Sequence, residues 1–409
     1  MAETSASPPL AAGMADDRRA RRAVPILAWG QAVLGAQLPV HFILGGLAGN
    51  LLAPDPAFST LPISMIVLGA MLFAPVVSLM MGRWGRRIGF LFGAGAGLVG
   101  AVLAERAIVG QSFPLLLAGA FAAGAYMAAH NLYRFAAADA ASPGFRPKAI
   151  AWVLAGGLVA AVLGPELVVW FQDALAPVPY AGAYRVLIAV NLLGAIPLLF
   201  LDLPRPPRTK RGEARGRPWR AIFADPRVPV AMLCAMVAYA LMNLVMTSTP
   251  LAIVGCGFTT ADAAGVVRVH VLAMYLPSFF TGALIARFGT PRVIAAGLAL
   301  LFAGSMVAIS GLELLHFNVA LALVGVGWNL GFVGATAMLA GAHLPEERAR
   351  VQGLNDFLVM GLVTIASFSS GALMSRFGWE AVNLAMIPPL SLAAAALIWL
   401  LVRERGARA

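Results

Sequence analysis

Long apolar runs alternate with short polar gaps along almost the whole chain. Each run holds about 20 residues, and an α-helix of that length crosses the roughly 30 Å of hydrocarbon in a bilayer. Glycine, proline and aspartate mark the gaps, as in "APDPAF" and "LAPVPYAG", and indicate turns. The pattern predicts twelve transmembrane helices, at residues 24–50, 61–82, 88–109, 113–140, 147–171, 181–203, 228–254, 262–286, 293–312, 315–342, 350–374 and 379–402.

The amino-acid composition agrees with this pattern. Of the 409 residues, 60% are hydrophobic and only 11% are charged, and the mean hydropathy is +0.85. Soluble proteins carry about 25% charged residues, so this chain has too few to cover a water-facing surface of its size. The sequence therefore predicts an all-α polytopic membrane protein and excludes a soluble globular domain.

Basic residues are distributed unequally between the two sets of loops. One set comprises the even-to-odd loops, the stretch after the sixth run and both termini, and it holds 24 of the 29 Lys and Arg residues. Because basic loops stay on the cytoplasmic side, we expect both termini to be cytoplasmic. The net charge of +11 comes from these loops and not from one basic domain, which argues against nucleic-acid binding.

The chain divides into five parts. Residues 1–23 form a polar cytoplasmic tail, and because no small-residue cleavage site follows the first run, we expect an uncleaved first helix. Residues 24–203 form the first six-helix bundle, and residues 228–402 form the second. Between them, residues 204–227 include "PRPPRTKRGEARGRPWR", whose proline and charge content predicts a flexible basic linker. Residues 403–409 form a second cytoplasmic tail.

The two halves repeat a loop motif. "GRWGRR" at 82–87 follows the second run, and "ARFGTPR" at 286–292 follows the eighth. Repeats of six spans indicate a transporter that works by alternating access around a central cavity. Together with the basic linker and the Gly164–Pro165 pair of the fifth run, these motifs resemble the major facilitator superfamily over essentially the whole chain. The resemblance implies the major facilitator fold, with twelve transmembrane helices in two pseudo-symmetric six-helix bundles.

Sulfur and imidazole side chains flank the turn between the seventh and eighth runs. "MNLVM" places Met242 and Met246 four residues apart, and "HVLAM" places His270 and Met274 four residues apart. Residues four apart share a helix face, so both pairs can face one cavity. Thioether sulfur is soft and favours Cu(I), and neutral imidazole also suits copper. Methionine is equally a common filler of apolar cores, so the spacing alone leaves ligand and packing roles open.

These motifs are similar to those of the CcoA-type copper importers, which are bacterial inner-membrane facilitators that supply copper for cytochrome oxidase assembly. The resemblance implies copper import across the inner membrane, with the four residues as metal ligands and no cofactor. It implies a cytoplasmic copper acceptor or a thiol redox protein as partner, and Cys234 and Cys256 are the cysteines that could take part. A related branch resembles riboflavin transporters. The alternative is therefore a carrier of riboflavin or another small organic solute, with the methionines as an apolar wall.

Further polar side chains in the spans are candidates for gating or proton coupling. His41 is a proton site, a further ligand or a packing histidine, and Glu166 is either functional or simply interfacial. Arg134 can pair with Asp139 or Asp356 as an inner gate, because buried charges need partners. The chain contains no catalytic constellation and no G-x-x-x-x-G-K-[ST] sequence, so we expect neither an enzyme nor ATP-driven transport.

Overall fold

The computed structural model describes residues 10–142, 145–203 and 216–406, and these ranges fold into helices without a β-strand. The N half contains α1 (Leu10–Val33), α2 (Gln37–Leu52), α3 (Leu61–Trp84), α4 (Arg86–Val109), α5 (Phe113–His130), α6 (Tyr133–Ala140), α7 (Arg146–Phe171) and α8 (Ala181–Leu198). After the short α9 (Trp219–Phe223), the C half contains α10 (Arg227–Gly255), α11 (Thr260–Tyr275), α12 (Ser278–Phe288), α13 (Thr290–Ile309), α14 (Leu314–Trp328), α15 (Gly334–Ala340), α16 (Arg348–Leu384) and α17 (Ile387–Gly406).

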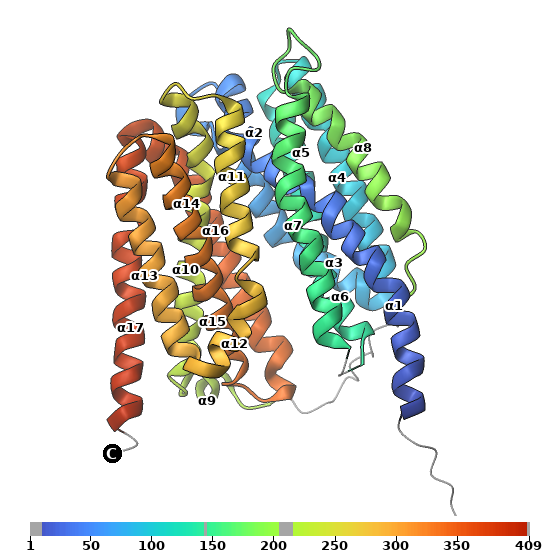
Figure 1. The fold of residues 1–409 in the computed structure, drawn as a ribbon, viewed down its shortest axis with the longest axis vertical. Coiled ribbons are helices and arrows are strands. Elements are labelled where there is room, and N and C mark those ends of the chain that lie inside the picture. Colours follow the sequence, from blue (N-terminus) through green and yellow to red (C-terminus); the bar gives the residue numbers. More distant parts are fainter. Residues whose placement is uncertain (1–9, 143–144, 204–215, 407–409) are drawn as a thin grey trace, which may run out of the picture.

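The described residues contain ten or eleven candidate crossings, and a break within the last of them accounts for the twelfth that the sequence predicts. Ten helical segments are long and apolar enough to cross a membrane, and the bent pair α11 and α12 adds another. The last of the ten, Arg350–Glu404, has 55 residues, or roughly 80 Å of helix at 1.5 Å per residue, which is too long for one crossing. Gly378 interrupts it with a φ of 77°, a left-handed conformation that glycine adopts without strain, and the chain runs back from there (Figure 1).

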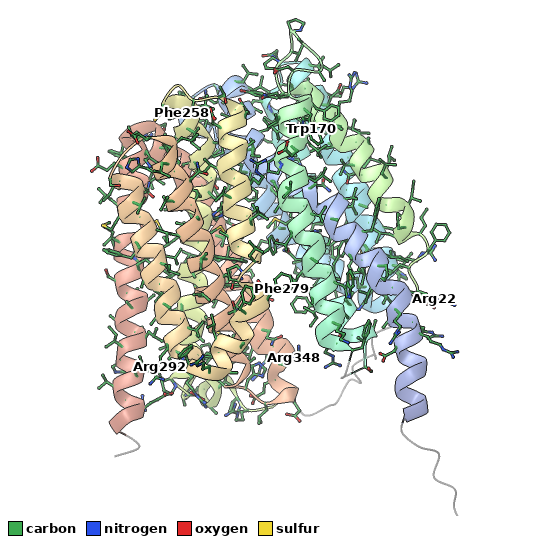
Figure 2. The ribbon with its side chains drawn as sticks, in the orientation of Figure 1. Arg22, Trp170, Phe258, Phe279, Arg292 and Arg348 are labelled. Atoms are coloured by element: carbon green, nitrogen blue, oxygen red, sulfur yellow. The ribbon has the colours of Figure 1, made fainter. Side chains whose placement is uncertain are left out.

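The two halves lie side by side as two helical bundles (Figure 1). The start of α1, the short helix α9 and the end of α17 lie at one end of the molecule, which we call the terminal face, and we call the opposite end the distal face. Figure 2 shows Arg22, Arg292 and Arg348 toward the terminal face, and Trp170 and Phe258 toward the distal face. These three arginines, which belong to the loops and the terminus that the sequence assigns to one side, lie toward the same end of the molecule.

The halves contact one another near the distal face and diverge toward the terminal face (Figure 1). In this contact, which we call the distal seam, α7 packs against α11, and α3 packs against α16. The Ser64 hydroxyl oxygen lies 3.0 Å from that of Ser367. A Cβ added to Gly371 would lie 2.3 Å from the Thr60 hydroxyl oxygen, so glycine is what allows the halves to approach so closely at this point.

Small residues also allow close packing within each half. Helices α4 and α5 cross where a Cβ on Gly119 would lie 2.9 Å from the carbonyl oxygen of Gly100. Such close approach of backbones is a common means of helix association in membranes. Lipid tails are as apolar as the side chains, so burial of apolar surface contributes little to the association of helices there. The frequent glycines therefore serve helix packing.

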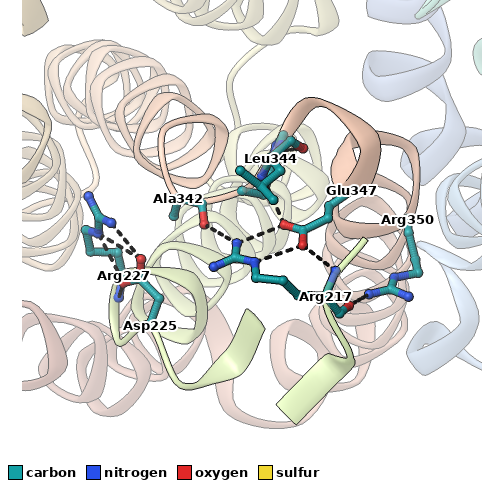
Figure 3. A network of polar contacts seen from close by, with 8 residues as sticks. Arg217, Asp225, Arg227, Ala342, Leu344, Glu347 and Arg350 are labelled. Carbon is teal, nitrogen blue, oxygen red and sulfur yellow. Dashed lines mark hydrogen bonds and ion pairs between the residues drawn. The ribbon is translucent and has the colours of Figure 1, made fainter. Parts of the chain in front are cut away.

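A buried carboxylate fixes the segment before α10 to the C half (Figure 3). Glu347 has no exposed surface. It accepts hydrogen bonds from the Arg217 backbone N (2.8 Å), the Arg217 Nε (2.9 Å) and Nη2 (2.8 Å), and the Leu344 backbone N (2.9 Å). These bonds, those of the Arg217 guanidinium foremost, hold the pKa of the Glu347 carboxyl well below its usual range. Arg350 donates to the Arg217 carbonyl oxygen at 2.5 Å and covers the Trp219 ring at 4.3 Å.

The ends of the predicted domains are only partly described. Residues 10–23, which the sequence assigns to the N-terminal tail, are helical and belong to α1. The remaining tail residues 1–9, the linker residues 204–215 and the C-terminal residues 407–409 lie outside the described ranges. The assignment of the tails and the linker as separate parts therefore stays a prediction.

Candidate functional site

A cavity lies between the two halves, where small-molecule sites are often found. Helices of both halves line it, and none of its lining residues is Asp, Glu, Lys or Arg. The N half contributes Gln31, Gly35, Leu38, Pro39, Phe42, Met127, His130, Asn131, Gly157, Ala160 and Ala161. The C half contributes Tyr239, Met242, Asn243, Met246, Val271, Met274, Tyr275 and Val363.

The C-half wall of this cavity is built mainly of thioether and aromatic side chains. On α10, Tyr239, Met242 and Met246 follow one another at spacings of three and four residues, so they share a face of the helix. On α11, Met274 and Tyr275 complete the wall. Thioether groups pack well against aromatic rings, so this surface suits the flat face of a ring.

The N-half wall carries two amides and an imidazole. Gln31, His130 and Asn131 line the cavity from α1 and the end of α5. The His130 ring packs between Tyr126 and Tyr133, with ring centroids 5.3 and 5.2 Å away, which fixes its orientation. The C-half wall adds the amide of Asn243, so both walls combine apolar surface with groups that can form hydrogen bonds.

Three of the four predicted metal ligands line the cavity, but the fourth does not. Met242, Met246 and Met274 are among the lining residues. His270 has no exposed surface, and its Nδ1 lies 2.7 Å from the carbonyl oxygen of Leu321 on α14. Residues four apart differ by about 40° around a helix, which is enough to turn His270 into the contact with α14. The expectation that all four side chains converge on one pocket is wrong, and their role as metal ligands stays untested.

The other candidates in the outer half of the molecule have different surroundings. His41 is buried on α2, with its ring centroid 6.1 Å from that of Tyr184, and it does not line the cavity. Glu166 of α7 forms an ion pair with Arg268 of α11, and the side chains are 24% and 40% exposed. This pair joins the two halves across the distal seam, which the sequence did not indicate.

The proposed inner gate is only partly constrained by the structure. Asp139 forms an ion pair with Arg86, which leaves Asp356 as the partner that was suggested for Arg134. The guanidinium of Arg134 lies 4.9 Å from the centroid of the Phe135 ring. Arg134 and Asp356 are both exposed, and a gate formed by this pair stays a prediction.

The two cysteines differ in accessibility. Cys234 on α10 is buried, Cys256 at the end of α10 is exposed, and both are free thiols. Among the described residues, no group of three or more His, Cys, Asp and Glu side chains is placed to hold a metal ion.

Sequence reasoning missed Asn329, a buried residue that connects three elements. Its side-chain nitrogen donates to the Met274 carbonyl oxygen at 2.8 Å and to the Ser278 hydroxyl at 2.6 Å, and its oxygen accepts from the Thr281 hydroxyl at 2.6 Å. Asn329 begins a π-helical turn between α14 and α15, while Pro277 separates α11 from α12. A lone amide within an apolar span was the signal that could have drawn attention to it.

Comparison with known proteins now shows the family. The family model of the Major Facilitator Superfamily matches residues 24–363 and, in a second match, residues 266–409. The chain belongs to the major facilitator superfamily. The predicted fold is therefore confirmed, and the protein is a multi-pass membrane protein of a transporter family, which is a non-enzyme class.

Members of the superfamily resemble this chain over most of its length. The riboflavin transporter RfnT of Brucella anthropi is 40% identical over 400 residues, which cover 97% of this chain and 100% of the relative. The uncharacterized transporter YddS of Bacillus subtilis is 29% identical over 359 residues, covering 83% of this chain and 81% of the relative. The crystal structure of the nucleoside transporter NupG shares the fold, with a TM-score of 0.69, 15% identity, and coverage of 94% of this chain and 99% of that one.

The copper interpretation is wrong. A relative that matches nearly the whole chain at 40% identity is a riboflavin transporter, so the resemblance to the CcoA-type copper importers is not supported. Copper as the substrate, copper binding and a role in cytochrome oxidase assembly lose their support with it. The paired methionine motif misled because a thioether is a soft metal ligand and also an ordinary apolar surface.

Proposed function

We propose that this protein carries riboflavin, or a closely similar uncharged flavin, across the bacterial inner membrane by alternating access. The observation that carries the proposal is the 40% identity with a riboflavin transporter over the full length of that relative. The match extends over both halves, and therefore over the segments that form both walls of the central cavity.

The chemistry of the cavity supports a flavin as the substrate. Riboflavin has a flat three-ring system with apolar faces, a polar pyrimidine edge and a hydroxylated chain. The methionines and tyrosines of the C-half wall suit the ring faces. The polar groups of the N-half wall can orient the ring, as a few placed polar groups do in most small-molecule sites.

The arrangement of the halves supports transport by a rocking motion. They are in contact at the distal seam and diverge toward the terminal face (Figure 1), which is one of the two end states of alternating access. The grouping of basic residues at the terminal face supports a cytoplasmic position for that face and for both termini. In this orientation the observed state would release the solute to the cytoplasm.

Uptake of radiolabelled riboflavin tests the proposal. The host is a bacterium that cannot make riboflavin and lacks its own importer, and it expresses either this chain or an empty vector. We expect saturable riboflavin uptake only with the chain, and equal copper accumulation in the two strains. Riboflavin uptake no faster than with the empty vector, in cells whose membranes contain the protein, would refute the proposal.

The uncharged lining predicts discrimination against phosphorylated flavins. A phosphate group in this cavity would lose its hydration without gaining a charged partner among the lining residues. An excess of unlabelled flavin mononucleotide should therefore compete with riboflavin uptake at least tenfold less well than unlabelled riboflavin does. Equal competition by the two flavins would show that the solute does not occupy this cavity.

A further inference from the structure

We propose that Gln31 recognises the polar edge of the transported ring through a pair of hydrogen bonds. The inference rests on the proposed flavin substrate and names the residue that selects it. Gln31 lies on α1, lines the central cavity and is only 8% exposed. Its side chain makes no hydrogen bond to the residues that the structure describes, and its amide atoms are not among the enclosed polar atoms, so they are accessible from the cavity.

Gln37 shows what a structural glutamine looks like in the same part of the chain. Its amide pairs with Asn191 in both directions, at 3.2 and 3.3 Å, and it is completely buried. It does not line the cavity. The Gln37 amide is satisfied within the protein, whereas the Gln31 amide lines the cavity without a protein partner, so Gln31 is the glutamine that is free to bind a solute in the cavity.

The surroundings of Gln31 indicate where that partner lies. A Cβ added to Gly157 would lie 3.5 Å from the Gln31 side-chain nitrogen and 3.7 Å from two carbons of the Tyr275 ring. The Gln31 amide of the N half and the Tyr275 ring of the C half therefore lie on either side of the point that a Gly157 side chain would occupy. A flat ring that packs against Tyr275 would present its edge to the amide of Gln31.

The chemistry of a carboxamide defines the edge that it recognises. An amide offers one acceptor oxygen and an N–H donor side by side, and this pair complements a ring N–H next to a ring carbonyl. Glutamine and asparagine read the edge of adenine by the same kind of paired bond. The pyrimidine edge of a flavin offers such a pair at N3–H and the neighbouring carbonyl oxygen. The cavity would thus select an uncharged ring with an imide edge.

Binding to the purified full-length protein tests this assignment, with quenching of flavin fluorescence as the readout. Loss of a bidentate pair should weaken riboflavin binding about tenfold to a hundredfold in Gln31→Leu. Riboflavin methylated at N3 should bind the wild type similarly weakly, whereas Gln31→Leu should bind the two flavins equally. Gln37→Leu is the matched control, and we expect it to lower the melting temperature while keeping riboflavin affinity.

Gly157→Ala tests the position of the ring independently of the amide. The added methyl group would meet its neighbours at ordinary contact distances, so this variant should fold, yet it occupies the space between Gln31 and Tyr275. We expect weaker riboflavin binding. The assignment is overturned if the riboflavin affinity of Gln31→Leu is within twofold of that of the wild type. It is equally overturned if N3 methylation weakens flavin binding to the wild type and to Gln31→Leu by the same factor, or if Gly157→Ala leaves the riboflavin affinity unchanged. Failure of the wild type to bind any flavin would instead refute the proposed function.

Discussion

The ion pair between Glu166 and Arg268 should bias the protein toward the state in which the distal seam is closed. The two side chains belong to different halves and are 24% and 40% exposed, so solvent screens part of their attraction. Partly exposed pairs contribute about 1 kcal/mol. If rocking separates the halves at this face, Glu166→Gln removes that contribution from the closed state alone and increases the distal-open population about fivefold.

A cysteine in the cavity reports this population. In a Cys256→Ser background, Met246→Cys places a thiol on the cavity wall, and a maleimide reagent that cannot cross membranes is added from the distal side. We expect labelling of the Glu166→Gln variant to be about fivefold faster than labelling of the parent. The charge swap Glu166→Arg with Arg268→Glu should restore the slow rate, because it rebuilds the attraction.

The matched control is an ion pair on the same side of the molecule within one half. Glu105 of α4 pairs with Arg185 of α8, so Arg185→Gln should leave the labelling rate of the folded protein unchanged. The reasoning fails if Glu166→Gln labels at the parent rate, or if Arg185→Gln accelerates labelling as much as Glu166→Gln does.

Three further predictions concern stability and orientation. Asn329→Ala leaves buried groups without partners and should destabilise the fold by about 2 kcal/mol, which would be measured as a lower melting temperature. The control variant Asn318→Ala loses one hydrogen bond within its own helix and should change the melting temperature little. Folding lowers the pKa of the Glu347 carboxyl from 4.5, so its ionised form stabilises the fold fully above that pH, and the contribution is lost as pH falls from there toward the lowered pKa. Glu347→Gln should therefore flatten the fall in melting temperature between pH 5 and pH 3, and an unchanged slope in this range would contradict the reasoning. An impermeant maleimide added to intact cells should label the exposed Cys256 and not the buried Cys234, and protection of Cys256 would contradict the proposed orientation.

The fold could be predicted from the sequence because its signals are local. The length of each apolar run and the side on which arginines gather are set by the bilayer, so span number and pairing into halves followed without knowledge of distant contacts. The bend between α11 and α12 was not anticipated, although Pro277 marks it. Asn329, which bonds to residues on both sides of the bend, lies 55 residues after Met274 and 51 residues after Ser278 in the chain.

The site was predicted only in part, for a physical reason. Helical spacing shows which residues share a face, and Met242 and Met246, which share one, line the cavity together with Met274 of the next helix. It does not show which neighbour that face meets, and His270 turned out to meet α14. The partner of Glu166 was equally hidden, because Arg268 is 102 residues away in the chain. Gln31 carried no sequence signal, since its significance depends on the bonds that it does not make.

The amide of Asn329 offers a route by which contact with a bound solute could affect a distant part of the same span. It ties the backbone of Met274, which borders the ring-binding space, to Ser278 and Thr281 on the far side of the break at Pro277. A displacement of α11 is thereby transmitted to α12 through the Asn329 side chain, which follows α14 in the chain. The break between α11 and α12 can thus act as a hinge that is held by the Asn329 side chain. A solute in contact with Met274 would then displace α12, near the terminal face, without touching it.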